Sequence, residues 1–130
     1  MNKWIAKPLV GVNNVLFGMP REDVRKTLNL GYKEFKKSKY SKNTTDDFGV
    51  CHVFYDVDNR CCAIEVFDDV EVKISETIIF PKSLDILKTL ASDLEEVENG
   101  NYVSKSYSIG IYAPTGKMES IIFAGEGYFV

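Results

Sequence analysis

The chain has 130 residues, of which 45% are hydrophobic and 27% are charged, and its formal net charge is −3. These proportions predict one globular domain spanning 1–130 and exclude a disordered or low-complexity chain. The longest apolar runs, such as 77–80 and 120–124, have the length of strands, which excludes a transmembrane helix.

The first element that the sequence predicts is a short helix that begins after Pro20. Proline is preformed for the first helical position, and Glu22 and Asp23 in the first turn suit the helix dipole. Gly31 is expected to end this helix. The stretch 36–47 that follows is rich in Ser, Thr and Asn, which is typical of a surface loop.

A β-hairpin is expected next, with strands over 48–57 and 61–67 around an Asp58-Asn59 turn. A two-residue turn sets a register in which one face belongs to the core and the other is a mixed surface. The core pairs are Cys51 with Val66, Val53 with Ile64, and Tyr55 with Cys62; the pairs on the other face are His52 with Glu65, Phe54 with Ala63, and Asp56 with Cys61.

The second half of the chain predicts one or two strands within 70–80 and then a helix that opens at Pro81. Leucines at helical spacing extend this helix to about Ala91 or Leu94. A second hairpin follows, with strands over 103–113 and 118–124 and a turn over 114–117.

The two halves of the chain resemble each other. The segment 23–28 is identical to 85–90 at four positions, and each segment precedes a polar loop and a hairpin. We therefore predict an α+β fold in which one antiparallel sheet carries two helices on one face, with a helix-then-hairpin unit repeated in tandem. Chance agreement is the alternative, because helices favour these residue types.

Charge is distributed unevenly along the sequence. Residues 1–45 contain ten bases and three acids, whereas residues 46–98 contain fourteen acids and four bases. This polarity predicts a negative surface that attracts a basic protein and repels nucleic acid, although ordinary solvated charge would give the same pattern. The basic stretch 33–42 also contains aromatic residues, but its short length and the acidic balance of the chain favour a solvated loop.

His52 is the only histidine, so a catalytic triad or a histidine metal site would have to be built around it. Glu65 on the facing strand could orient it, and Cys51 is its neighbour in sequence. Alternation along a strand sends Cys51 and His52 to opposite faces, which argues against an activated thiolate. A catalytic His52 is therefore the minor alternative.

The remaining patterns predict neither a metal site nor a bound cofactor. The adjacent pair Cys61 and Cys62 cannot turn both sulfurs to one face of a regular strand, and a second ligand pair at zinc-like spacing is missing. The glycines do not form a phosphate-binding fingerprint. Three cysteines and the absence of a secretory signal at residues 1–8 favour a reducing cytoplasm.

Short patterns at 11–12, 17–19, 22–25, 55–56 and 108–112 resemble small bacterial immunity proteins of contact-dependent growth inhibition and related polymorphic toxin systems. The Phe-Gly-Met-Pro segment at 17–20 is also similar to the helix start of BamE-like lipoproteins and β-lactamase-inhibitor-like repeats. The first resemblance implies a cytoplasmic protein that binds and neutralises a cognate toxin domain, often a nuclease. The second implies helix-hairpin repeats.

We expect the chain to bind a basic toxin domain through an acidic surface, without catalysis, cofactor, nucleic acid or membrane. A scaffold that binds another protein and a small hydrolase that uses His52 are the alternatives. The sequence predicts no oligomeric state. The expected partner-binding residues are Phe54, Asp56, Asp58, Glu65, Asp68, Asp69, Glu71 and Tyr112.

Overall fold

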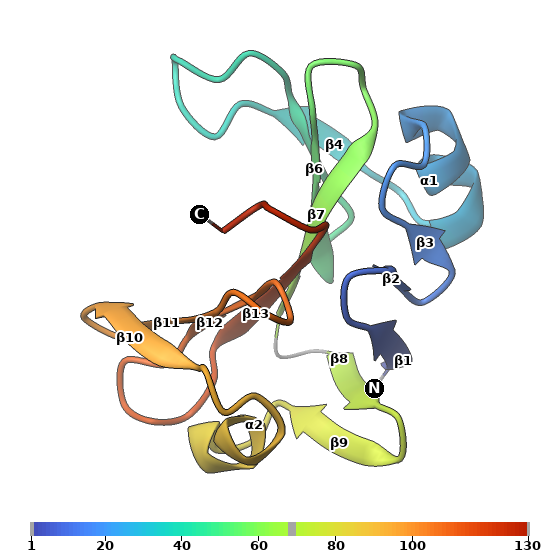
Figure 1. Ribbon diagram of the computed structural model, residues 1–130. Helices are drawn as coiled ribbons and strands as arrows, with labels where there is room; N and C mark the ends of the chain where they lie inside the picture. The colour runs from blue at the N-terminus through green and yellow to red at the C-terminus, as the bar shows by residue number, and fades with distance from the viewer. Residues whose placement is uncertain (1, 68–69, 130) are drawn as a thin grey trace.

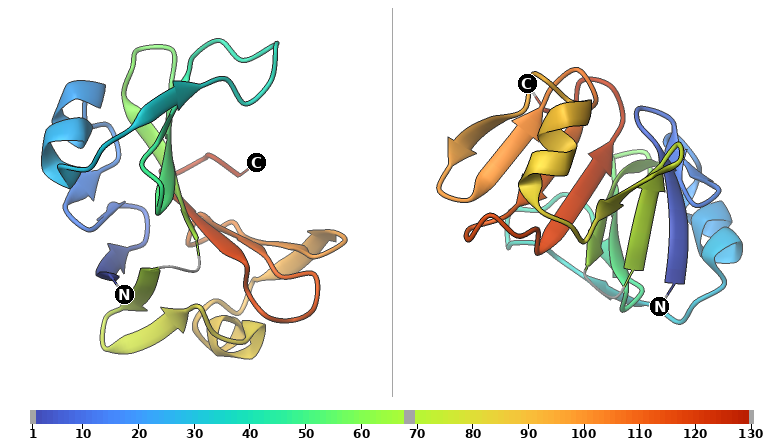
Figure 2. Two further views of the ribbon diagram at one scale, coloured as in Figure 1. Left: turned by 180° about the vertical axis from the view of Figure 1, so that it is seen from behind. Right: turned by 90° about the horizontal axis from the view of Figure 1, so that it is seen from below.

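The computed structural model describes residues 2–67 and 70–129 and consists mostly of strands. Strand residues make up 46% of the described part and helical residues 12%. The strands form a five-stranded and an eight-stranded sheet, with the smaller sheet against one face of the larger one (Figure 1). Figure 2 shows the same arrangement from behind and from below.

The small sheet has the strand order β3-β2-β1-β8-β9, in which β1 and β8 run parallel. Trp4 and Ala6 of β1 point inward and are buried, while Lys3, Ile5 and Lys7, which alternate with them, are exposed. Asn13 and Asn14 connect β2 to β3 with φ of 47° and 74°, as a tight type I′ hairpin turn requires. The strands are β1 (Asn2–Lys7), β2 (Gly11–Val12), β3 (Val15–Leu16), β8 (Val70–Ile74) and β9 (Thr77–Phe80).

The large sheet is antiparallel throughout and has the order β10-β11-β12-β13-β7-β6-β5-β4. Two runs of four consecutive strands join where β13 pairs with β7. The strands are β4 (Lys33–Phe35), β5 (Thr45–Asp47), β6 (Cys51–Tyr55), β7 (Cys61–Phe67), β10 (Glu95–Glu98), β11 (Asn101–Ser104), β12 (Ile109–Tyr112) and β13 (Ser120–Ala124).

Each helix is short and precedes one of these four-stranded runs. Helix α1 (Arg21–Leu28) begins after Pro20 and ends at Asn29, which has a left-handed conformation with φ of 50°. Helix α2 (Leu84–Leu90) begins after Ser83 and buries Leu84 and Leu87. Helices of this length depend on packing against the rest of the fold.

The main core lies between the two sheets. Side chains from one face of the large sheet, such as Ile64 and Phe123, meet Val12 and Phe80 of the small sheet, and Val24 of α1 closes one end. Strand β2 contacts β13, and α1 contacts β3. The opposite face of the large sheet is not part of this core, and we call it the open face.

The predicted α+β fold is wrong. The fold is mostly β, the layer against the large sheet is a second sheet rather than two helices, and each helix leads into four strands rather than into a hairpin. The sequence pattern did not indicate β1 to β3, and it placed β5 within a loop. It also extended the second helix as far as Leu94, although α2 ends at Leu90 and β10 begins at Glu95.

The predicted register of the first hairpin is correct at most pairs. Cys51 pairs with Val66, His52 with Glu65, and Phe54 with Ala63. Tyr55, however, pairs with Cys61 rather than Cys62, because a bulge leaves Cys62 as an extra residue between Cys61 and Ala63, the partners of Tyr55 and Phe54.

Candidate functional site

The open face of the large sheet is the most distinctive surface of the described chain. Alternation along β6 and β7 sends Cys51, Val53 and Ile64 into the core and His52 and Glu65 to the open face. The last described residues, 125–129, leave β13 on this same side, away from α1 and β1 to β3 (Figure 1). The open face is therefore partly covered by the carboxyl-terminal segment.

A row of polar side chains crosses the open face over β5, β6, β7 and β13. His52 lies between two carboxylates, with Nε2 3.5 Å from Asp47 Oδ1 and Nδ1 3.9 Å from Glu65 Oε1. The hydroxyl of Ser120 donates a hydrogen bond of 3.1 Å to Glu65 Oε2. These contacts fix the Glu65 carboxylate and the His52 ring on the face of the sheet.

Aromatic rings hold the imidazole on both sides. The His52 ring packs edge-on against Phe35 and Phe67, with centroid distances of 5.0 and 4.8 Å. The Ser120 hydroxyl donates to Glu65 rather than to His52, and Cys51 lies on the core side, where burial raises the pKa of its thiol to about 12. The described contacts therefore hold the His52 ring in one orientation, between two carboxylates and two aromatic rings.

A second, smaller apolar cluster lies on the open face. It consists of Phe54, Ala63 and Ala124, against which Ile122 and Phe129 pack. The Phe129 ring lies over Gly110, where an added Cβ would come within 2.8 Å of the ring. Glycine at this position is thus what allows the carboxyl-terminal segment to pack flat on β12.

Beside this cluster the open face is hollowed by a cavity of about 330 Å³. Its rim is apolar and acidic: Tyr112 is 42% exposed, Val97 is 51% exposed, and Glu65 and Glu98 contribute carboxylates. Strand β10 is the edge of the sheet at this point, and all four of its residues are exposed. The hollow therefore presents aromatic, aliphatic and acidic groups together on a continuous sheet.

Of the expected partner-binding residues that the structure describes, only Glu65 and Tyr112 line this hollow. Phe54 is buried, and the ammonium of Lys37 lies 4.0 Å from the centre of its ring. Asp56 and Asp58 are exposed in the β6–β7 turn, where the Asp56 carboxylate accepts hydrogen bonds from the N–H groups of Asp58 and Arg60. These three residues do not line the hollow.

Among the remaining expected acids, Glu71 does not line the hollow either. Glu71 lies on β8 of the small sheet, where it pairs in register with Lys3. Asp68 and Asp69 lie outside the described residues. The sequence pattern did not indicate Val97 and Glu98, because 93–98 has the composition of an acidic connection after a helix. The one signal that could have identified them is the apolar Val97 between two glutamates.

A buried ion cluster beneath α1 was also missed. Asp46 is fully buried and accepts two hydrogen bonds of 2.8 Å from Arg25 and one of 2.8 Å from the Tyr55 hydroxyl. The Arg21 guanidinium stacks on the Tyr55 ring at 4.0 Å and donates to Glu34 at 2.7 Å. Burial, followed by the hydrogen bond to Asp46, raises the pKa of Tyr55 above its usual range. This cluster fastens α1 to β4, β5 and β6.

The described residues contain no group of three or more histidine, cysteine or acidic side chains placed to hold a metal ion. None of the helices in the described part is long and apolar enough to cross a membrane. Comparison of the chain with protein-family models, with curated proteins and with solved structures finds no match.

Proposed function

We propose that this protein is an immunity protein that binds a cognate toxin domain, and that it does so through the open face of the large sheet. The observation that supports the proposal is the hollow, where exposed Tyr112, Val97 and Glu98 lie around the same cavity as the partly buried carboxylate of Glu65. The resemblance of the sequence to immunity proteins supplies the class of partner.

The chemistry of the hollow fits a basic protein. A nuclease toxin has a positively charged groove for its substrate, and carboxylates on a facing surface would attract it and speed association. Tyrosine gives a large contact area with a polar tip and is enriched at the centres of protein interfaces. In this assignment Tyr112 is the anchor, and Glu65 and Glu98 select a basic partner.

The set of partner-binding residues changes accordingly. Glu65 and Tyr112 remain, and Val97 and Glu98 are added because they line the same hollow. Glu71 is removed because Lys3 lies beside it on the other sheet, so that its charge is offset by a base. We retain no role in partner binding for Phe54, because it is buried beneath Lys37.

The test uses the nuclease domain of a toxin encoded next to the gene for this chain, purified and assayed for DNA cleavage. The unaltered protein should abolish cleavage at equimolar concentration. Tyr112→Ala should weaken binding by about 2 kcal/mol or more, as expected for an anchor. Tyr40→Ala, at a tyrosine that is 80% exposed on the β4–β5 connection, is the matched control and should leave affinity unchanged.

The charge of the hollow is tested separately with Glu98→Lys. This reversal should slow association, and the effect should shrink as salt is raised, because exposed charges are screened. Glu76→Lys, an exposed acid between β8 and β9, is the control. Full inhibition of the nuclease by both open-face variants would exclude this surface, and a neighbourhood that encodes no toxin would contradict the proposal as a whole.

A further inference from the structure

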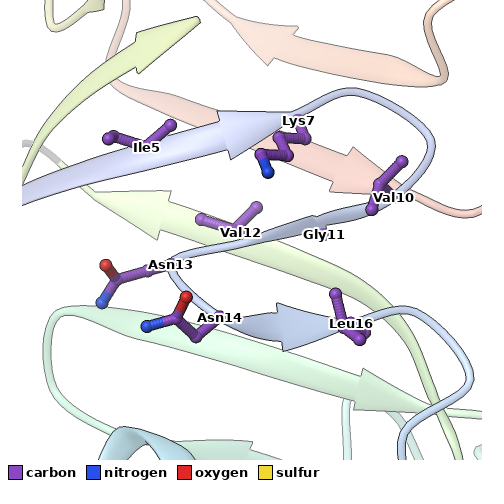
Figure 3. Close-up of a pocket in the computed structure, with 8 residues that line it drawn as sticks. All are labelled: Ile5, Lys7, Val10, Gly11, Val12, Asn13, Asn14 and Leu16. Atoms are coloured by element: carbon purple, nitrogen blue, oxygen red, sulfur yellow. The ribbon is translucent and has the colours of Figure 1, made fainter.

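The outer face of the small sheet carries a second cluster of exposed apolar side chains. Ile5, Val10 and Leu16 are 55%, 50% and 49% exposed and surround a cavity of about 330 Å³. Figure 3 shows these side chains around the hollow together with Lys7, and the amides of Asn13 and Asn14 at the β2–β3 turn. The core of the fold does not use these groups.

The turn that presents this cluster has an unfavourable residue at its centre. The Val10 N–H donates to the Lys7 carbonyl at 2.9 Å, which places Pro8 and Leu9 at the two central positions. Leu9 has φ of 70°, a left-handed conformation that suits glycine or asparagine at this position of a turn. Its side chain is 40% exposed, so burial does not offset this strain.

A strained apolar residue held in an exposed position indicates a constraint other than folding. A glycine at position 9 would adopt the same conformation without strain. The leucine instead adds apolar surface beside Val10 and the hollow.

The charge on this face is opposite to that of the open face. Alternation along β1 places Lys3, Ile5 and Lys7 outward, and Lys73 of β8 pairs in register with Ile5. Glu71 is the acid that the same alternation places among them. The surface is therefore apolar in its centre and positive at its rim, which complements a segment with an apolar centre and acidic flanks.

We infer that the outer face of the small sheet is a second docking surface, which binds an acidic segment of a protein partner and takes one of its apolar side chains into the hollow. Lys7 pairs with a flanking carboxylate, and the amides of Asn13 and Asn14 bind the backbone of the segment. This surface lies on a different sheet from the open face, so the inference does not depend on the proposed function.

A peptide segment fits this face better than a bilayer does. Electrostatic attachment to an anionic membrane uses clusters of about four to eight lysines or arginines, and this face has three lysines with an acid among them. The apolar groups also surround a hollow rather than a single protruding ridge. A concave site of this kind suits the insertion of one side chain.

The experiment is a titration of the ¹⁵N-labelled protein with the peptide GEEILEEG, capped at both ends, followed by NMR. The controls are GKKILKKG, which reverses the charge, and GEESSEEG, which removes the apolar residues. The acidic apolar peptide should shift amide signals of residues 3–16 and 71–73. Each control should bind with an affinity at least about tenfold lower, since both charge and apolar contact contribute.

Two variants separate binding from folding. Lys7→Glu should weaken binding of the acidic peptide about tenfold, whereas Lys105→Glu, at an exposed lysine between β11 and β12, should not change it. Leu9→Gly should raise the melting temperature, because it relieves the strained turn, and should weaken peptide binding. Lower stability together with unchanged binding would overturn the role of Leu9.

Three outcomes would overturn the inference. The first is that the acidic peptide shifts none of these signals, or shifts them equally in the Lys7→Glu variant. The second is that the same signals move with protein concentration alone, which would identify a second copy of the chain as the occupant. The third is that vesicles containing phosphatidylglycerol broaden them while the peptide has no effect. Loss of toxin binding at the open face would leave the result of this titration unaffected.

Discussion

Replacing Asp46 with alanine should destabilise the protein by about 3–5 kcal/mol, because it removes one partner of a buried ion pair. Asp46 is fully buried and accepts hydrogen bonds from the Arg25 guanidinium and from the Tyr55 hydroxyl, each of 2.8 Å. Alanine would leave both donors without this acceptor in a site that water does not reach freely. The Arg25 side chain is only 15% exposed, so its charge would remain largely desolvated.

Glu34 provides a matched control within the same cluster. Its carboxylate contacts Arg21 at 2.7 Å and Arg25 at 2.9 Å, but the Glu34 side chain is 50% exposed. Because water can replace a carboxylate at that position, Glu34→Ala should cost about 1 kcal/mol or less. The prediction is thus a difference between two carboxylates that contact the same arginine at nearly equal distances.

Urea denaturation followed by circular dichroism measures both losses, and linear extrapolation gives the free energy of unfolding provided that the m-values agree. Equal losses for Asp46→Ala and Glu34→Ala would refute the reasoning, since burial would then make no difference. A second readout is the NMR signal of His52. Asp47 follows Asp46 on β5 and faces His52, so loosening β5 should also shift the imidazole signals.

Three further predictions concern the large sheet and its connections. Hydrogen bonds, first from the Ser104 hydroxyl, lower the pKa of Asp93 from 3.8 to about 2. The contribution of the Asp93 carboxylate to stability should therefore be complete above about pH 4 and fall as the pH drops toward 2. A carboxyl-carbon NMR titration would measure the pKa, and acid denaturation compared with Asp93→Asn would measure the loss of stability. Gly110→Ala should cost about 1–3 kcal/mol by displacing the Phe129 ring, and less in a Phe129→Ala background, as double-mutant denaturation would reveal. Iodoacetamide should modify Cys62 before the two buried thiols, whose pKa burial raises to about 12, and mass spectrometry after brief labelling should find one adduct.

The first hairpin was predictable from the sequence because its alternation is regular. Residues 51–54 and 63–66 alternate between core and open face, and this alternation together with the Asp58-Asn59 turn predicts the pairing of His52 with Glu65 that the sheet contains. The bulge at Cys61 and Cys62 was not predictable. It adds one residue to β7 opposite Tyr55, and two identical residues in a row give no sign in the sequence of which one is extra.

The fold class was not predictable by the same means. Strands β2 and β3 have two residues each, too few for a period of two to be recognised in the sequence. Strand β10 is an edge strand with all four residues exposed, so its Glu-Glu-Val-Glu sequence resembles a solvated connection. Acids on an edge strand discourage accidental pairing with other chains, and this protection removes the apolar signal by which strands are recognised.

The candidate site was predictable only where a side chain lies on a regular strand. Glu65 and Tyr112 reach the hollow because their strands alternate and lie in one sheet, separated by β13. Glu98 reaches it from a strand that the sequence did not predict. Glu71 belongs to the same acidic stretch of sequence as Glu65, yet the chain passes to the other sheet between them.

The basic and acidic segments of the sequence therefore correspond only in part to separate basic and acidic surfaces of the fold. Arg25, from the basic first third of the chain, is bound to Asp46, from the acidic middle, so both charges are used inside the fold. Lys7 and Glu98 are exposed, and they lie on different sheets. Exposed bases of the small sheet and exposed acids of the large sheet thus remain apart once buried ion pairs such as Arg25 with Asp46 have formed. This separation would allow one small domain to present two surfaces of opposite charge to different partners.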